Sequence, residues 1–201
     1  MKITLFSGTA NPTLAGAVAA KLGLGLGSLL VDRFPDGELH VSLRESVRGL
    51  DVYLLQPASP PVAENLVELL LMADACRRSG AAHVTAVVPY LGYARQDRRV
   101  KDGEPIGARV VADAIASGGV QRLIVVDLHN PALEGFFGVP LEHLSAVSLL
   151  AEALRPMLPQ RAVLVAPDLG AVRLAELYAV LLDLPAATVH KVRLSGEQVR
   201  A

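Results

Sequence analysis

The chain has 201 residues, of which 52% are hydrophobic, and its formal net charge at pH 7 is −1. This apolar content is enough for one large or two modest hydrophobic cores. Because the charges nearly balance, no nucleic acid and no anionic membrane is expected as a partner, and a bound anion must be held by a few placed groups. No apolar stretch reaches the roughly 18 residues of a membrane span, and the N-terminal MKITLFSGTANP has no signal-peptide pattern. We therefore expect a cytoplasmic protein.

Strand-like runs alternate with helical runs along the chain. Continuous apolar runs such as HVTAVV and RLIVV are typical of strands buried on both faces, and hence of a mostly parallel sheet covered by helices. The order of the elements predicts an α/β fold with doubly wound sheets. The pattern restarts after residue 144, so that we expect a boundary between two domains, 1–144 and 145–201. The expected strands are residues 2–6, 37–43, 51–56, 83–90, 122–129, 161–167 and 186–192, and the expected helices are residues 12–22, from 62 onward, 106–117, 145–154 and 172–182.

Two sequence features that could indicate a catalytic nucleophile or a dinucleotide-binding loop are better explained by a structural role. The single cysteine, Cys76, lies in the apolar helical run NLVELLLMADACRRSG, which favours a packed thiol over a nucleophile. The glycine-rich GLGLGS, residues 23–28, follows a predicted helix rather than a strand. Its glycines are therefore expected to end that helix rather than to bind a dinucleotide.

Polar and charged side chains gather directly after the predicted strands. In open parallel sheets, ligands bind in the crevice outside the carboxyl ends of the strands. One such strand is followed by PYLGYARQDRR, residues 89–99, which holds two of the four tyrosines of the chain beside three arginines. The residues that we expect along this edge of the sheets are Ser7, Gly8, Thr9, Asn11, Gln56, Arg95, Gln96, Asp97, Asp127, His129, Asp168, His190, Lys191 and Arg193.

His129 and Asp168 are candidate metal ligands. An imidazole and a carboxylate at strand ends could hold a divalent cation, and Mg²⁺ sites commonly combine few protein ligands with phosphate oxygens of the substrate. In the alternative interpretation, His129 bonds to a backbone group and Asp168 caps the helix that follows it.

The stretch RFPDGE, residues 33–38, also has two interpretations. Pro-Asp-Gly between strands is strong turn chemistry. The same turn could present Phe34 as a stacking face for a flat ring, with Asp36 and Glu38 accepting hydrogen bonds from an amino group or a ribose. Further along, the arginines of residues 95–99 are either solvated loop residues or ligands for a polyphosphate.

The motifs RFPDGE, PYLGYARQDRR, VVDLHNPALEGFFGVP and APDLGAV, in this order and at these distances, resemble the ribose-phosphate pyrophosphokinase family from Met1 to about Arg193. The resemblance implies a phosphoribosyltransferase-like fold of two related domains, of which the second, 145–201, is incomplete in this chain. It also implies Mg²⁺-dependent transfer of the β,γ-diphosphoryl group of ATP to the 1-hydroxyl of ribose 5-phosphate, which gives phosphoribosyl pyrophosphate and AMP. Homo-oligomers, built from dimers that assemble into a hexamer, are implied as well.

The resemblance also assigns roles to particular residues. The turn residues would bind the adenine of ATP from a neighbouring subunit, and the residues after the strands would bind its phosphates and Mg²⁺. The implied ATP ligands are Phe34, Asp36, Glu38, Arg95, Gln96 and Asp97; the implied metal-binding residues are His129 and Asp168; and the implied catalytic residues are Lys191, Arg193 and His129.

The chain departs from the family pattern at several positions. An acidic loop of the form Asp-Asp-x-x-x-Thr-Gly-Gly-Thr, which binds ribose 5-phosphate in the family, does not occur in the sequence, so that we expect the chain to be part of a longer protein. Smaller departures indicate a divergent branch; they are Asn130, Pro131, Glu134, Gly138 and Ala171.

Two functions of different classes are therefore compatible with the sequence. The first is a ribose-phosphate diphosphokinase, which is favoured by the presence of both Lys191 and Arg193. The second is a catalytically inactive, synthetase-like subunit that regulates or scaffolds an active partner. A phosphoribosyltransferase would not account for RFPDGE or ARQDRR.

Overall fold

The computed structural model describes residues 2–189, 192–193 and 199–200. The chain forms two compact units, Met1–Leu144 and Ser145–Ala201, which are treated separately below. Within the described ranges, no helix has the length and the apolar character needed to cross a membrane.

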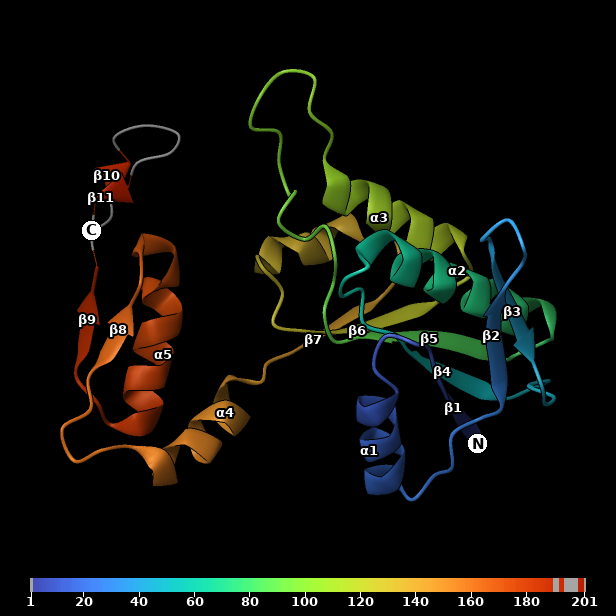
Figure 1. The fold of residues 1–201 in the computed structure, drawn as a ribbon, viewed down its shortest axis with the longest axis horizontal. Helices are drawn as coiled ribbons and strands as arrows, with labels where there is room; N and C mark the ends of the chain where they lie inside the picture. The colour runs from blue at the N-terminus through green and yellow to red at the C-terminus, as the bar shows by residue number, and fades with distance from the viewer. Residues whose placement is uncertain (1, 190–191, 194–198, 201) are drawn as a thin grey trace. The chain divides into compact units, whose positions relative to one another are not determined.

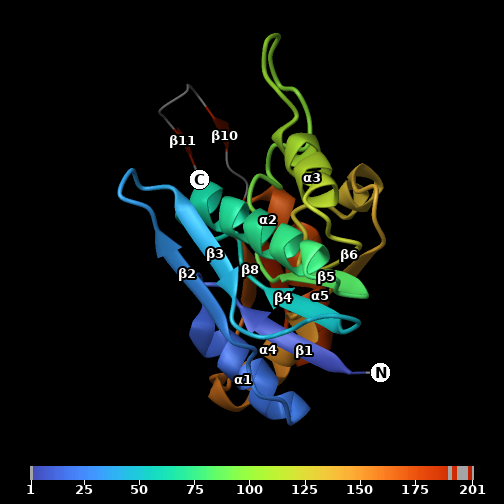
Figure 2. The same cartoon turned by 90° about the vertical axis from the view of Figure 1, so that its right-hand side faces the viewer.

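The first unit is built on a parallel five-stranded sheet in the order β1-β4-β5-β6-β7 (Figure 1). Its strands are β1 (Ile3–Ser7), β4 (Asp51–Leu55), β5 (His83–Val88), β6 (Arg122–Val126) and β7 (Leu141–Leu144). Helix α1 (Pro12–Leu22) covers one face of the sheet, and α2 (Val62–Arg78) and α3 (Gly107–Ser117) cover the other (Figure 2). This arrangement confirms the predicted α/β class with a mostly parallel sheet.

Strand β4 shows why the strands of this sheet have continuous apolar sequences. Val52 and Leu54 face the core that includes α2 and α3, whereas Leu55 packs against Ala15 and Ala19 of α1. Because successive side chains of a strand point to opposite faces, a strand covered by helices on both sides needs apolar residues at nearly every position.

A β-hairpin lies beside the sheet and packs on α2 (Figure 2). It consists of β2 (Leu29–Arg33) and β3 (Leu39–Leu43), which pair antiparallel. Its tip is RFPDGE: the amide of Phe34 donates to the carbonyl of Glu38 at 2.9 Å, and Gly37 adopts a left-handed φ of 94°. The turn expected from Pro-Asp-Gly is therefore present. Gly23 likewise ends α1 with a φ of 66°, as expected for GLGLGS.

The second unit repeats the strand–helix pattern on a smaller scale. Strands β8 (Leu164–Ala166) and β9 (Ala186–Thr188) pair in parallel, and α5 (Val172–Leu182) connects them and packs against α4 (Val147–Leu154). The strand expected over residues 186–192 is shorter than predicted, since β9 ends at Thr188. The remaining elements are the 3₁₀ turns η2 (Arg155–Met157) and η3 (Leu169–Ala171) and the antiparallel pair β10 (Val192–Arg193) and β11 (Val199–Arg200).

The thiol of Cys76 is fully buried in the core between α2 and the sheet, as predicted. Burial disfavours the thiolate and raises the pKa of Cys76 from 9.0 to about 12. The thiolate is the reactive species, so we expect the native protein to react with Ellman's reagent at pH 8 at least about 100-fold more slowly than the protein unfolded in guanidinium chloride. Rapid stoichiometric labelling of the native protein would contradict this assignment.

The same shift predicts a pH dependence of stability. Because the pKa of the Cys76 thiol is higher in the folded state, its contribution to stability is fully present below about pH 9 and is lost as the pH rises towards about 12.

Candidate functional site

A cleft of about 460 Å³ lies at the carboxyl ends of β5 and β6. It brings together the loop that follows β5, with the sequence PYLGYARQ, and the loop that follows β6, with the sequence DLH. The polar and aromatic side chains that line it are Tyr90, Tyr93, Arg95, Gln96, Asp127 and His129.

The loop after β5 is held in a tight conformation by its own backbone. Tyr93 adopts a left-handed φ of 64°, which is uncommon for a residue with a side chain and persists only where the surroundings fix it. The amide of Gln96 donates to the carbonyl of Tyr93 at 2.9 Å, and the carbonyl of Gln96 accepts from the amide of Ala108 in α3 at 3.1 Å. Arg95 and Gln96 are thereby presented on a loop that is anchored at the start of a helix.

Asn130 ties the two loops of the cleft together. Its side-chain nitrogen Nδ2 donates to Oδ2 of Asp97 at 3.1 Å. Its side-chain oxygen Oδ1 accepts from the amide of Ala132 at 3.0 Å and so caps the 3₁₀ helix η1 (Pro131–Phe136). Asp97 therefore does not line the cleft but holds the loop that carries His129.

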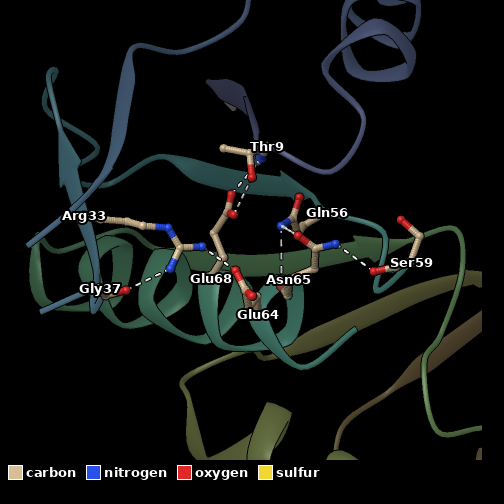
Figure 3. A network of polar contacts seen from close by, with 8 residues as sticks. All are labelled: Thr9, Arg33, Gly37, Gln56, Ser59, Glu64, Asn65 and Glu68. Atoms are coloured by element: carbon tan, nitrogen blue, oxygen red, sulfur yellow. Dashed lines mark hydrogen bonds and ion pairs between the residues drawn. The ribbon is translucent and has the colours of Figure 1, made fainter. Parts of the chain in front are cut away.

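The loop after β1 is anchored from inside the unit (Figure 3). Glu68 is only 2% exposed, and its carboxylate accepts from the amide of Thr9 at 2.7 Å and from the Thr9 hydroxyl at 2.6 Å. Gln56 is fully buried; its oxygen accepts from the amide of Ala10 at 3.1 Å, and its nitrogen donates to the carbonyl of Asn65 at 3.4 Å. Gln56, expected at the ligand-binding edge, is instead an internal anchor of this loop.

A second hollow, of about 450 Å³, lies between this loop, the hairpin and α2. Its polar lining includes Thr9, Arg33, Glu64 and Glu68. Arg33 donates to the carboxylate of Glu64 and to the carbonyl of Gly37 (Figure 3), and Glu68 is bonded to Thr9. The bonds of Arg33 hold the hairpin against α2, and the bonds between Thr9 and Glu68 hold the loop after β1. The polar side chains of this hollow therefore have a structural role.

The turn residues do not line the 460 Å³ cleft. Phe34 is 49% exposed and its ring centroid lies 5.0 Å from that of His40. Oδ1 of Asp36 accepts from the amide of Glu38 at 3.1 Å. The turn therefore presents an aromatic face and two carboxylates to the outside of the unit from a fixed backbone.

The remaining predicted site residues belong to the second unit. Oδ1 of Asp168 accepts from the amide of Ala171 at 3.1 Å, so that Asp168 caps η3 as in the structural alternative. Arg193 lies in β10, and His190 and Lys191 lie outside the described residues.

The donor chemistry of the cleft is compatible with a magnesium–nucleotide complex rather than with a preformed metal cage. Among the residues that the structure describes, no group of three or more His, Cys, Asp and Glu side chains is placed to hold a metal ion. Mg²⁺ commonly uses one or two protein carboxylates together with water and the phosphates of its substrate, so that it needs no such group.

Comparison with known proteins decides the family. Residues 3–119 match the family described as the N-terminal domain of ribose phosphate pyrophosphokinase. The chain belongs to the ribose-phosphate pyrophosphokinase family. The match covers the parallel sheet up to the end of α3, which includes the loop with Arg95 and Gln96.

Curated relatives and a solved structure extend the similarity over nearly the whole chain. The chain is 46% identical over 195 residues to ribose-phosphate pyrophosphokinase 1, chloroplastic, of Oryza sativa subsp. japonica, and covers 49% of that protein. It is 44% identical over 195 residues to the ribose-phosphate pyrophosphokinase of Synechocystis, of which it covers 59%. The crystal structure of phosphoribosylpyrophosphate synthetase from Mycobacterium smegmatis superposes with a TM-score of 0.89 at 38% identity, over 100% of this chain and 66% of that chain. The chain thus spans about half the length of the curated relatives that it matches.

In this member of the ribose-phosphate pyrophosphokinase family, two residues that hold the loops of the cleft in place could not be identified from the sequence. Asn130 was noted only as a departure from the family pattern, although its amide joins the two loops of the cleft. His143 lies in β7, whose short sequence LEHL gives a weak strand signal, and its ring accepts from the amide of Leu128. Both contacts join residues more than ten positions apart, and no local pattern of the sequence signals them.

Proposed function

We propose that this chain provides the ATP-binding part of a ribose-phosphate diphosphokinase. The observation that carries the proposal is the cleft at the carboxyl ends of β5 and β6, where Arg95, Gln96 and His129 lie on two loops joined by Asn130. Transfer of a phosphoryl-type group needs mainly positioning and charge neutralisation from the protein, and this set of side chains is suited to both.

The cleft residues would bind the phosphates of ATP. The guanidinium of Arg95 offers a planar fork of N–H donors that matches phosphate oxygens, and Gln96 adds an uncharged amide. Asp97 acts in the proposed ATP site through its hydrogen bond with Asn130, which fixes the loop of His129.

The proposed metal-binding residues are His129 and Asp168, and the metal would be Mg²⁺ bound with the nucleotide. When bound, Mg²⁺ would neutralise charge on the phosphate oxygens and orient them. His129 is exposed on the lining of the cleft, which supports its role in holding the magnesium–nucleotide complex. The resemblance to the family supports Lys191 and Arg193 as the cationic groups that stabilise charge on the transferred diphosphoryl group.

The adenine would be bound by Phe34, Asp36 and Glu38 of a second copy of the chain in a homo-oligomer. Two observations support this: the turn lies outside the lining of the cleft in its own unit, and it is held rigidly with its aromatic ring exposed. Arg33 stabilises the turn by bonding to Gly37 within it and to Glu64 of α2.

A catalytically inactive, synthetase-like subunit that regulates or scaffolds an active partner is the second candidate function. It is favoured by Asp168, because this proposed metal-binding residue has its Oδ1 engaged in capping η3 through the amide of Ala171. Ribose 5-phosphate is the proposed acceptor only for the first candidate.

A direct assay separates the two candidates. The protein is incubated with ATP, MgCl₂ and ribose 5-phosphate, and AMP and phosphoribosyl pyrophosphate are quantified by ion-exchange chromatography. Their formation in equal amounts, dependent on ribose 5-phosphate, supports the diphosphokinase. Binding of ATP without formation of AMP favours the inactive subunit.

The first residue of α3 offers a test of Gln96. A Cβ at Gly107 would lie 2.3 Å from Oε1 and 2.9 Å from Cδ of Gln96. Because Gln96 is exposed, it can swing away at little cost in stability, but it then leaves its place in the cleft. We expect Gly107→Ala to change the unfolding free energy by less than about 1 kcal/mol and to weaken ATP binding about 10-fold, the effect of losing one hydrogen bond.

The matched control is Gly135→Ala, because a Cβ at Gly135 in η1 meets no atom within 4 Å. Both variants are titrated with ATP and MgCl₂ by calorimetry. Equal affinities of Gly107→Ala and Gly135→Ala would rule out the assignment of Gln96.

A further inference from the structure

The hydrogen-bond ladder of the sheet ends where the loop of His129 begins. Strands β6 and β7 pair up to Val126 and Leu144, and the amide of Asp127 still donates to the carbonyl of Leu144 at 2.9 Å. Strand β7 ends at Leu144, so the amide of Leu128 has no further strand position to bond to. Its acceptor is instead a side chain: Nε2 of His143 lies 2.9 Å from the nitrogen of Leu128.

This contact defines which ring nitrogen of His143 carries the proton. A backbone amide always donates, so Nε2 must offer its lone pair and the proton of the neutral ring must be on Nδ1. Nδ1 faces Oε1 of Glu134 in η1 at 3.6 Å, and a carboxylate on that side favours the tautomer with the proton on Nδ1. Glu134, His143 and the Leu128 amide thus form a chain from η1 through β7 to the loop.

The loop whose Leu128 amide donates this hydrogen bond contains a backbone conformation that is uncommon for a residue with a side chain. Asp127 adopts a left-handed φ of 47°, which costs free energy and persists only when the surroundings fix it. The hydrogen bond to Leu128 acts between Asp127 and His129, the two polar residues by which this loop lines the cleft. Only 22% of the His143 side chain is exposed, so water has limited access to replace its nitrogen as the acceptor.

We propose that His143 is a positioning residue of the cleft: as a neutral acceptor oriented by Glu134, it fixes the backbone at Leu128 and with it the place of the His129 ring. The effect on nucleotide binding rests on the proposed function, whereas the effect on the loop does not. Partners of this kind, one step removed from the binding groups, typically change affinity about 10- to 100-fold when they are lost.

Two substitutions at His143 test whether the hydrogen-bond acceptor of this side chain, rather than its size, holds the loop in place. His143→Gln retains an acceptor oxygen at a similar distance from the backbone, and His143→Leu removes the acceptor while keeping an apolar side chain of similar size. Amide hydrogen exchange at Leu128 is measured by ¹⁵N NMR on the chain, and affinity for ATP with MgCl₂ is measured by calorimetry. We expect His143→Leu to speed exchange at Leu128 and to weaken ATP binding, each about 10-fold, and His143→Gln to stay within about 3-fold of the parent in both.

Each outcome decides the proposal. Unchanged exchange in His143→Leu overturns the hydrogen bond, and faster exchange with unchanged affinity overturns the positioning role. If the parent protein does not bind ATP, the proposed function fails. The amide hydrogen-exchange measurement at Leu128 then still decides whether His143 fixes the loop.

A further variant covers the case in which His143→Leu does not fold. Glu134→Gln alters an exposed side chain and leaves His143 in place. It is expected to speed exchange at Leu128 about 3-fold, because the ring loses the carboxylate that favours the proton on Nδ1. Exchange as slow as in the parent would then overturn the role of the Glu134–His143 pair.

Discussion

Gly8→Ala is expected to lower the unfolding free energy of the first unit by about 3–5 kcal/mol, which combines an overpacked buried site with the loss of its hydrogen bonds. A Cβ at Gly8 would lie 2.2 Å from Oε1 of Gln56 and 2.8 Å from Oε1 of Glu68. Both side chains are buried and cannot swing into solvent. Moving them breaks their bonds to the amides of Thr9 and Ala10 and leaves a buried carboxylate poorly paired.

Urea denaturation followed by circular dichroism measures this effect. The matched control is Gly16→Ala in α1, where a Cβ meets no atom within 4 Å. Since alanine is the better helix former, the control is expected to raise the unfolding free energy by about 0.5–1 kcal/mol. A Gly8→Ala protein with the urea midpoint of the parent would contradict the anchoring of this loop by Gln56 and Glu68.

Arg95→Ala is expected to weaken ATP binding by about 10- to 100-fold, because a hydrogen bond to a charged group contributes about 1.5–3 kcal/mol. Arg95 is exposed on the lining of the cleft, so its removal should change the unfolding free energy by less than about 0.5 kcal/mol. Arg95→Lys keeps the charge but loses the planar fork, and its affinity is expected between those of the parent and of Arg95→Ala.

Arg78→Ala serves as the control for net charge. Arg78 is the last residue of α2, pairs with Asp74, and does not line the cleft. Calorimetric titrations of the three variants with ATP and MgCl₂ are compared. An equal loss in Arg78→Ala and Arg95→Ala would mean that overall charge, rather than the loop after β5, attracts the nucleotide.

Four of the five strands of the parallel sheet, β1, β4, β5 and β6, and the loops that follow them were predictable because their signals are local, whereas β7 was not predicted. The continuous apolar run of β4 follows from burial on both faces, and Pro-Asp-Gly in RFPDGE is a strong local turn signal. The cleft formed by Arg95, Gln96 and His129 follows from the general rule that ligands bind where parallel strands end.

The side chains that hold the loops after β1 and β6 in place were not predictable in the same way. Gln56 follows a strand, as a site residue would, but its side chain turns inward because the loop after β1 has backbone amides that need acceptors. The hydrogen bond that His143 accepts is hidden as well, because the short β7 sequence LEHL gives a weak strand signal. Which nitrogen or oxygen meets which amide depends on contacts between distant segments, and these follow from the packing of the whole unit.

In the proposed function, the loops after β5 and β6 together bind a magnesium–ATP complex. The most direct test is one calorimetric comparison of ATP binding to the parent chain with MgCl₂, to the parent with EDTA, and to His129→Ala with MgCl₂. We predict saturable binding of one ATP per chain to the parent with MgCl₂, and affinities at least about 10-fold weaker with EDTA and in His129→Ala. No binding to the parent, or the same affinity in all three titrations, would contradict the claim.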